Sequence, residues 1–168
     1  MGVGSNGIGV RMNAGGGDFW VWANSGFARV AECLYQCEYV SMSEPSVAVI
    51  GASLDRRKYG NKAVRAYLEA GLTVFPVNPN EATIEGQRAY PNVDAIAEPI
   101  DYVSLYVPPA VGLKLLPAIA AKRPKEVWLN PGSESDELIE AAADLHVRIV
   151  VACSIVALGL SPGAFPDR

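Results

Sequence analysis

Five short apolar runs, separated by helix-length stretches, constrain the fold of this chain more than any other feature. The runs are residues 47–50, 72–77, 101–107, 126–129 and 147–152. Runs that are apolar on both faces are typical of strands buried on both sides, as in parallel sheets. Their alternation with helical stretches predicts a single α/β domain with a doubly wound, mainly parallel sheet of five strands and right-handed crossovers.

The connections between the runs carry helical patterns. The first has an apolar stripe of four residues: Val64, Tyr67, Leu68 and Gly71. The last three connections are each long enough for a helix. The final one has an acidic first turn, Ser133 or Ser135 as a cap, and an inner stripe of three residues: Leu138, Ala142 and Leu145. Gly112 and Pro117 interrupt the pattern after the third run, so we expect that helix to kink or to begin late.

The N-terminal residues differ in composition from the rest of the chain. Residues 1–26 hold 8 of the 16 glycines, which makes their ordering costly in backbone entropy. Residues 27–41 fit only a marginal amphipathic helix. We therefore expect 1–41 to be a disordered tail or an over-extended start, 42–160 to be the folded domain, and 161–168 to be a C-terminal tail.

Composition excludes several classes of protein. The 168 residues carry a net charge of -4, whereas a dedicated nucleic-acid binder normally has a basic surplus. The longest apolar run, 149–160, is shorter than the roughly 20 residues of a membrane-spanning helix. The N-terminus has no basic start followed by an apolar stretch, and three cysteines cannot all pair within one chain. We expect a cytoplasmic protein with no nucleic-acid or membrane partner.

The loop after the first run is the strongest candidate for a ligand site. In a doubly wound sheet the ligand binds outside the carboxyl ends of the strands. Gly51 and Ala52 would allow a ligand close to the backbone, and Ser53 can donate to a phosphate oxygen. Gly60 would relieve crowding where the helix begins. The fingerprint-like motif at residues 2–7 has no strand before it and no helix after it, so we treat it as a chance match.

Positive charge is concentrated at the same loop. Five of the 14 cationic residues lie within ten positions: Arg56, Arg57, Lys58, Lys62 and Arg65. A positive field at a helix N-terminus suits an anionic ligand. The alternative is that these residues form a solvated helix start with no ligand.

The end of the second run does not select a nicotinamide cofactor. An NAD site would place an acidic residue there to hold the ribose, and an NADP site would place an arginine. The segment reads Phe75-Pro76-Val77-Asn78-Pro79-Asn80 and has neither. Asn78 and Asn80 offer neutral hydrogen bonds that can hold an adenosine.

Five loop motifs occur in a characteristic order. They are Gly51-Ala52-Ser53, Tyr59-Gly60, Val77-Asn78-Pro79, Val107-Pro108-Pro109 and Trp128-Leu129-Asn130-Pro131-Gly132. In this order they resemble the stand-alone CoA-binding domain family, which is related to the N-terminal domain of the succinyl-CoA synthetase alpha subunit. The resemblance covers roughly Ser46 to Ser154.

The resemblance implies a Rossmann-like domain that binds coenzyme A. It implies a pyrophosphate near Gly51–Ser53 and Arg57, an adenosine near 77–80 and 107–109, and a crevice also lined by 130–132. The predicted cofactor-binding residues are Gly51, Ala52, Ser53, Arg57, Lys58, Tyr59, Gly60, Val77, Asn78, Pro79, Asn80, Val107, Pro108, Pro109, Asn130, Pro131 and Gly132. The family often has a lysine at the position of Asn80, and the neighbours of Cys153 also depart from its pattern.

No catalytic or metal-binding set is apparent. His146, the one histidine, precedes the last run and therefore belongs to the edge opposite the ligand, so we expect a structural or exposed residue. We expect Cys153 to pack as a small apolar residue rather than to act as a nucleophile. Cys33 and Cys37 have helical spacing but no further pair of zinc ligands. Tyr102, Tyr106 and Trp128 are expected to pack in the core.

The sequence therefore predicts a non-catalytic protein that binds CoA or an acyl-CoA, with a possible homo-oligomer or ligase partner. Three alternatives stay open. The domain can be an NAD(P)-binding module of an oxidoreductase. It can be the CoA-binding subunit of an acyl-CoA ligase that acts with an ATP-grasp partner. It can also be a thiol-regulated module in which Cys153 forms a mixed disulfide with CoA.

Overall fold

The computed structural model describes residues 8–13, 18–23 and 44–167. The chain divides into two units, Met1–Ser43 and Glu44–Arg168. In the first unit, β1 (Ile8–Asn13) pairs antiparallel with β2 (Asp18–Ala23). The sequence analysis assigned no strand here. The overlooked signal is the run of three glycines at 15–17 between two strand-length segments. The helix considered for 27–41, the motif at 2–7 and the two N-terminal cysteines lie outside the described residues.

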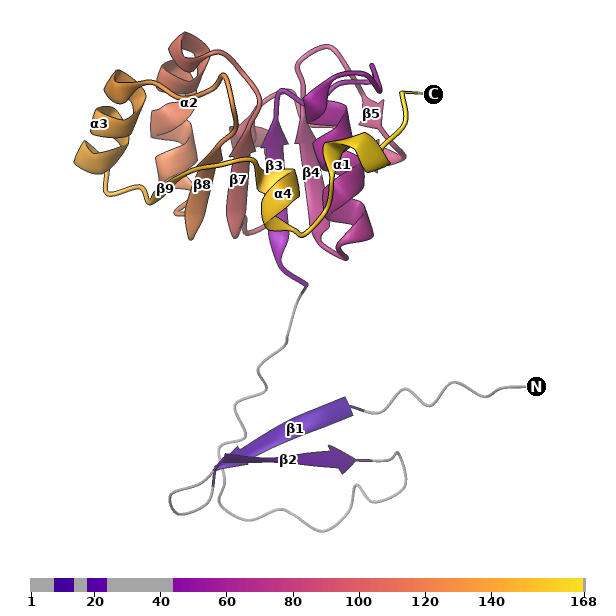
Figure 1. Ribbon diagram of the computed structural model, residues 1–168. Coiled ribbons are helices and arrows are strands. Elements are labelled where there is room, and N and C mark those ends of the chain that lie inside the picture. The colour runs from indigo at the N-terminus through magenta and orange to yellow at the C-terminus, as the bar shows by residue number, and fades with distance from the viewer. Residues whose placement is uncertain (1–7, 14–17, 24–43, 168) are drawn as a thin grey trace. The chain divides into compact units, whose positions relative to one another are not determined.

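A parallel sheet of five strands forms the centre of the second unit (Figure 1). The spatial order is β4-β3-β7-β8-β9, and every neighbouring pair is parallel. The strands are β3 (Ser46–Ile50), β4 (Thr73–Val77), β7 (Tyr102–Leu105), β8 (Glu126–Leu129) and β9 (Ile149–Val151). The expected α/β fold with a five-stranded parallel sheet is therefore confirmed.

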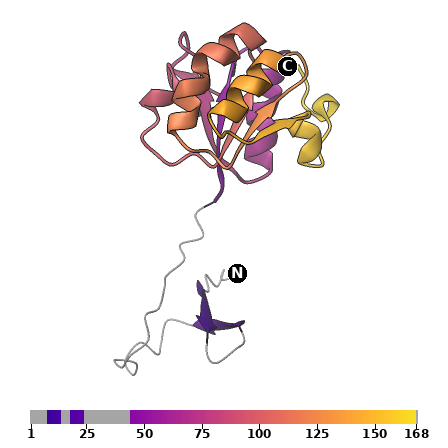
Figure 2. The ribbon, with the colours of Figure 1, turned by 90° about the vertical axis from the view of Figure 1, so that its left-hand side faces the viewer.

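Helices cover both faces of this sheet, as Figure 2 shows. On one face, α2 (Pro109–Ala121) and α3 (Asp136–Asp144) bury Leu116 and Leu138 against the sheet. On the other face, α1 (Tyr59–Glu69) and the short α4 (Ser154–Ala157) bury Val64 and Ile155. Each face thus has its own apolar core, as the doubly wound pattern requires.

Two of the helices differ from expectation in detail. α2 does not begin late. It starts at Pro109, where the missing N–H of proline is tolerated, and continues past Pro117. α3 is capped by Ser135, whose hydroxyl accepts from the N–H of Leu138. Leu145 was expected in its buried stripe but follows the end of the helix and is exposed.

The connection from β4 to β7 has no α-helix, although it is long enough for one. It contains a small hairpin of β5 (Thr83–Ile84) and β6 (Gln87–Arg88), then the 3-10 turn η1 (Val93–Ala95). The physical reason lies in the prolines and Gly86, which interrupt any helical run in this segment.

Residues 161–167, which we expected to be a tail, contact the domain over much of their length. The 3-10 turn η2 (Pro162–Ala164) leads to Phe165, which is buried in the same core as α1. Lys62 pairs with Asp167 at 2.8 Å. Among the described residues, no helix is both long and apolar enough to cross a membrane.

Candidate functional site

The strand order places four loops at one edge of the sheet. β3 lies between β4 and β7, and β8 follows β7, so the segments after these four strands meet at their carboxyl ends. The order corresponds to a sheet whose direction of winding reverses between its first and third strands, here β3 and β7. Ligands of such sheets bind at that reversal. The predicted site residues lie in these four loops, at the end of β4, or at the starts of α1 and α2.

Gly51 is required for close packing of the backbone between two loops. Its φ is +86°, and a Cβ there would lie 2.6 Å from the Tyr106 carbonyl oxygen and 2.9 Å from Cγ1 of Val107. The loop after β7 therefore occupies the space on the Cβ side of Gly51. This contact was not foreseen because its partner is distant in sequence, and the role of Gly51 in ligand binding stays a prediction.

Gly60 relieves crowding at the start of α1, as expected. A Cβ at this position would overlap the carbonyl oxygen of Gly51. The helix can therefore begin directly against the end of β3 only with glycine here.

Two asparagines hold the backbone of the first loop. The Asn78 amide donates to the Ala52 carbonyl at 2.7 Å, and the Asn61 amide donates to the Ser53 carbonyl at 2.8 Å. Asn78 was predicted to bond a ligand, but its amide nitrogen holds the loop and its oxygen accepts from the N–H of Asn80. Asn61 is fully buried and was missed. Its position three residues before Val64, on the inner face of the helix, was the available signal.

Most of the basic cluster is engaged within the protein. Arg56 donates to both carboxylate oxygens of Glu85, at 3.1 and 2.9 Å. Arg65 donates to the Asn61 side chain and to two backbone carbonyls. These pairings mean that the local charge is less available than the sequence count suggested.

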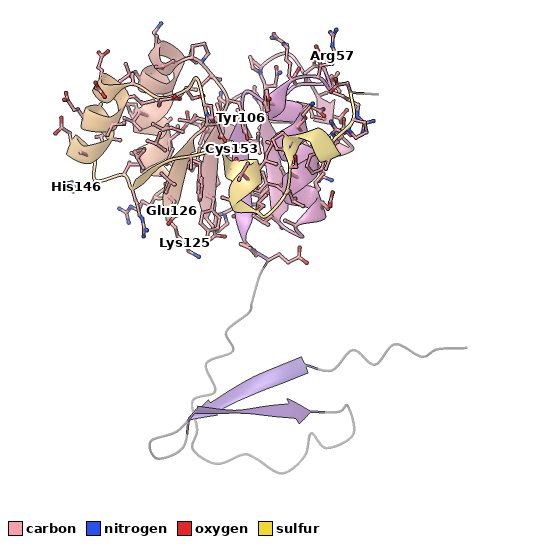
Figure 3. All side chains as sticks on the ribbon, viewed as in Figure 1. Arg57, Tyr106, Lys125, Glu126, His146 and Cys153 are labelled. Carbon is pink, nitrogen blue, oxygen red and sulfur yellow. The ribbon has the colours of Figure 1, made fainter. Side chains whose placement is uncertain are left out.

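Arg57 and Lys58 are the exposed residues of the cluster, and 75% of the Arg57 side chain is accessible. Figure 3 labels Arg57 at the outer end of the first loop. Its guanidinium makes two 2.9 Å bonds to Asp55, which lower the pKa of Asp55 to about 2. The same pair raises the pKa of Arg57. An exposed intramolecular pair of this kind contributes little free energy and can exchange for a stronger anion.

Asn130 was predicted to line the crevice but is buried. Its amide nitrogen donates to the Ser104 hydroxyl and the Leu105 carbonyl, while its oxygen accepts from the N–H of Ser154. The Ser154 hydroxyl in turn bonds those of Ser104 and Tyr106. Burial raises the pKa of the Tyr106 phenol. This network joins the ends of β7 and β8 to the start of α4.

The remaining predicted residues differ in exposure. Val77 is buried, whereas Val107 and Pro109 are half-buried. The exposed set consists of Lys58, Tyr59, Pro79, Asn80, Pro108, Pro131 and Gly132. Residues in this exposed set, together with Arg57 and the half-buried pair, are accessible to a bound molecule.

His146 and Cys153 lie apart from each other (Figure 3). His146 is exposed after α3, with Nδ1 3.2 Å from the Ala143 carbonyl oxygen. Cys153 is half-buried at the start of α4 and packs against the α1 core. Tyr102 and Tyr106 also pack there, while Trp128 is half-buried. Within the described ranges, no three metal-ligating side chains gather in one place.

A comparison with protein families matches most of the second unit to a known family. The model of the family "CoA binding domain" matches residues 45–159. The chain belongs to the CoA-binding domain family. The resemblance given by the loop motifs is thus confirmed, and the matched range contains β3 to β9 with their loops.

Curated relatives of this CoA-binding domain are much longer proteins. It is 30% identical over 115 residues to the alpha subunit of ADP-forming acetate–CoA ligase II from Pyrococcus furiosus, covering 62% of this chain and 25% of that subunit. It is 31% identical over 124 residues to the ADP-forming acetate–CoA ligase of Methanocaldococcus jannaschii, covering 69% of this chain and 18% of that protein. The chain spans a quarter or less of the length of these two relatives.

Similar solved structures include both small and large proteins. A conserved hypothetical protein from Pyrococcus furiosus aligns with a TM-score of 0.63 and 33% identity, over 67% of this chain and 98% of that one. A dinucleotide-forming acetyl-coenzyme A synthetase from Ca. Korarchaeum cryptofilum aligns with a TM-score of 0.57 and 26% identity, over 64% of this chain and 25% of that one. The domain therefore resembles both small chains of similar extent and one part of a synthetase.

Proposed function

We propose that this domain binds CoA or an acyl-CoA at the carboxyl edge of the sheet and carries out no chemistry of its own. The observation that carries the proposal is the loop from Gly51 to Lys58, in which Asn78 and Asn61 bond the carbonyls of Ala52 and Ser53. The pyrophosphate would lie at this loop, and the adenosine would lie beside residues 77–80 and 107–109.

Holding these carbonyls exposes consecutive N–H groups. Within one peptide unit the C=O and the N–H point in opposite directions. The bond from Asn78 to the Ala52 oxygen therefore turns the Ser53 N–H away, and the bond from Asn61 to the Ser53 oxygen does the same for Leu54. In the described part of the chain, neither N–H has an acceptor. Successive free N–H groups form a concave site for an anion.

The start of α1 adds to this site. Lys58 is the N-cap and makes no side-chain cap hydrogen bond. The N–H groups of Tyr59 and Gly60 have no acceptor among the described residues either. The partial positive charge of a helix N-terminus therefore lies beside the free loop amides. Arg57 and Lys58 supply full charges at the rim, which suits the pyrophosphate and the 3′-phosphate of CoA.

The position after β4 argues against NAD. A ribose-binding acidic residue is expected there in NAD proteins. Asn78 occupies that position, and both of its polar atoms are already bonded within the protein. An NAD(P)-binding role is therefore the weaker candidate.

A role beside a catalytic partner is the second candidate, favoured by the two longer relatives that are ADP-forming acetate–CoA ligases. In this case the domain would present CoA to a partner that supplies the ATP site and the reacting groups. Purification of the protein from its native cells, with mass spectrometry of what accompanies it, tests this candidate. An ATP-grasp protein in stoichiometric amount would support it, and a pure single chain would count against it.

Calorimetric titration tests the principal proposal. Wild-type protein should bind CoA at micromolar concentrations and NADH far more weakly. Arg57→Glu should weaken CoA binding about tenfold or more, because it removes charge-assisted hydrogen bonds and adds repulsion. Arg123→Glu is the matched control, since it makes the same charge reversal at an exposed residue after α2. Binding of NADH but not of CoA would refute the proposal.

A further inference from the structure

The turn of the β5–β6 hairpin has an unusual residue at its first position. Glu85 adopts φ +47° and Gly86 adopts φ +77°. Two successive positive φ angles are typical of a tight hairpin turn, for which Asn-Gly or Gly-Gly is favoured. A glutamate is a poor choice for the backbone at this position, so its side chain is the feature that needs an explanation.

The Glu85 carboxylate links this hairpin to the ligand loop and to α1. Oε1 accepts from Arg56 Nε at 3.1 Å and from the Asn61 amide at 2.9 Å, and Oε2 accepts from Arg56 Nη2 at 2.9 Å. The side chain is 18% exposed. The fork-like contact with Arg56 specifies direction as well as charge.

The contacts continue into a closed ring around the loop. Asn61 uses one amide hydrogen for Glu85 and the other for the Ser53 carbonyl, while its oxygen accepts from Arg65 Nε at 2.9 Å. Arg65 also donates to the Arg56 carbonyl at 3.2 Å. Both donors of Asn61 are thus committed, so the direction in which its amide faces Ser53 depends on Glu85.

We propose that Glu85 is a positioning residue for CoA binding, acting through Asn61 and Arg56 to hold the loop so that the Ser53 and Leu54 N–H groups stay available. This inference rests on the proposed function. It also explains why Arg56 is withheld from the ligand: its guanidinium anchors the loop, and Arg57 is left to meet the phosphate.

The electrostatic effect of Glu85 has the opposite sign, which makes the proposal testable. A carboxylate near the site repels an anionic ligand, so removal of its charge alone would strengthen CoA binding. Loss of its positioning role would weaken binding. Glu85→Asn separates the two, because asparagine suits the turn backbone but is one methylene too short to keep both contacts.

The experiment compares wild type, Glu85→Asn and Glu98→Asn by CoA titration, thermal unfolding without ligand, and amide hydrogen exchange. Glu98 is exposed and precedes β7, so its variant makes the same charge change far from the loop. We expect Glu85→Asn to weaken CoA binding about tenfold, with an unfolding temperature no lower than wild type and unchanged binding in the control. The Asp55 and Lys58 amides, which are bonded within the loop, should exchange faster.

The outcomes distinguish this inference from the proposed function. Equal or tighter CoA binding by Glu85→Asn would overturn the positioning role while leaving CoA binding intact. If wild type fails to bind CoA, the proposed function falls, and the exchange measurement then decides the loop: unchanged exchange at Asp55 and Lys58 would overturn the role of Glu85 as well.

Discussion

Gly60 and Gly112 both lie inside helices, but a methyl group would meet different atoms at the two positions. At Gly60 it would meet the carbonyl of Gly51, which belongs to the backbone and cannot move without displacing the ligand loop. At Gly112 the nearest atom is Cδ2 of Leu138 at 3.1 Å, the end of a flexible side chain. The two glycines therefore have different roles despite similar settings in the sequence.

Gly60→Ala should lower both stability and CoA affinity. Alanine gains about 1 kcal/mol of helix propensity over glycine at either site, but at Gly60 the clash with backbone outweighs it. We expect a loss of about 2 kcal/mol at Gly60 and a change within about 1 kcal/mol at Gly112. Urea unfolding and CoA titration of both variants provide the measurement. Equal stability of the two variants would contradict this account.

At the residue scale, the sequence identified important residues more reliably than it identified the groups that they contact. The crowding at Gly60 is predictable because it depends on neighbours in the chain. Asn78 and Asn130 were identified, but as ligand contacts, since nothing local reveals that their amides bond carbonyls of other loops. Glu85 was missed because its partner Arg56 is 29 positions away.

At the scale of elements, strands were predictable because burial on both faces requires continuous apolar runs. The connection from β4 to β7 was less predictable, because its length fits a helix while its prolines and turn residues determine a hairpin. The C-terminal segment was not recognised as part of the fold. Its single large apolar residue, Phe165, gives no periodic pattern, yet it fills a place beside α1.

Phe165→Ala should destabilise the domain by about 2–3 kcal/mol, below the usual cost for a central phenylalanine because this site is at the margin of the core. The side chain is 5% exposed, and the Arg65 guanidinium lies 5.5 Å from its ring. Val156→Ala, at an exposed residue of α4, should change stability by less than about 0.5 kcal/mol. Urea unfolding measures both, and a negligible effect at Phe165 would show that the segment is only loosely held.

At the scale of the whole molecule, the order of the strands was beyond prediction from one sequence, because it depends on which edge each crossover reaches. An ionic contact at the amino edge helps to hold that order. Asp101 accepts from the Ser46 N–H at 2.9 Å and pairs with Lys125 at 2.8 Å. It thereby joins the starts of β3, β7 and β8, and Figure 3 shows Lys125 at the edge opposite Arg57.

Asp101→Asn should make the free energy of unfolding depend less on pH in the acid range. The Lys125 ammonium and the Ser46 N–H lower the pKa of Asp101, so protonation favours the unfolded chain. The contribution is complete above about pH 4 and is lost as the pH falls through the folded-state pKa. The variant should be about 1 kcal/mol less stable at pH 7 and should approach wild type near pH 2. Urea unfolding of both proteins across this pH range checks the prediction. A difference in unfolding free energy that does not change with pH would contradict the ionic origin.

After β9 the chain returns to pack against α1, and this affects how the domain folds during translation. Arg65 and the Pro166 carbonyl that it bonds are separated by 101 positions. During synthesis, the face of α1 that receives Ile155 and Phe165 stays uncovered until residue 165 has left the ribosome. Earlier nascent chains can pair their strands but cannot complete this core. Folding to the final state therefore becomes possible only after residues 155–166 have emerged, and nascent chains halted before residue 165 should be more readily cleaved by protease than chains that contain these residues.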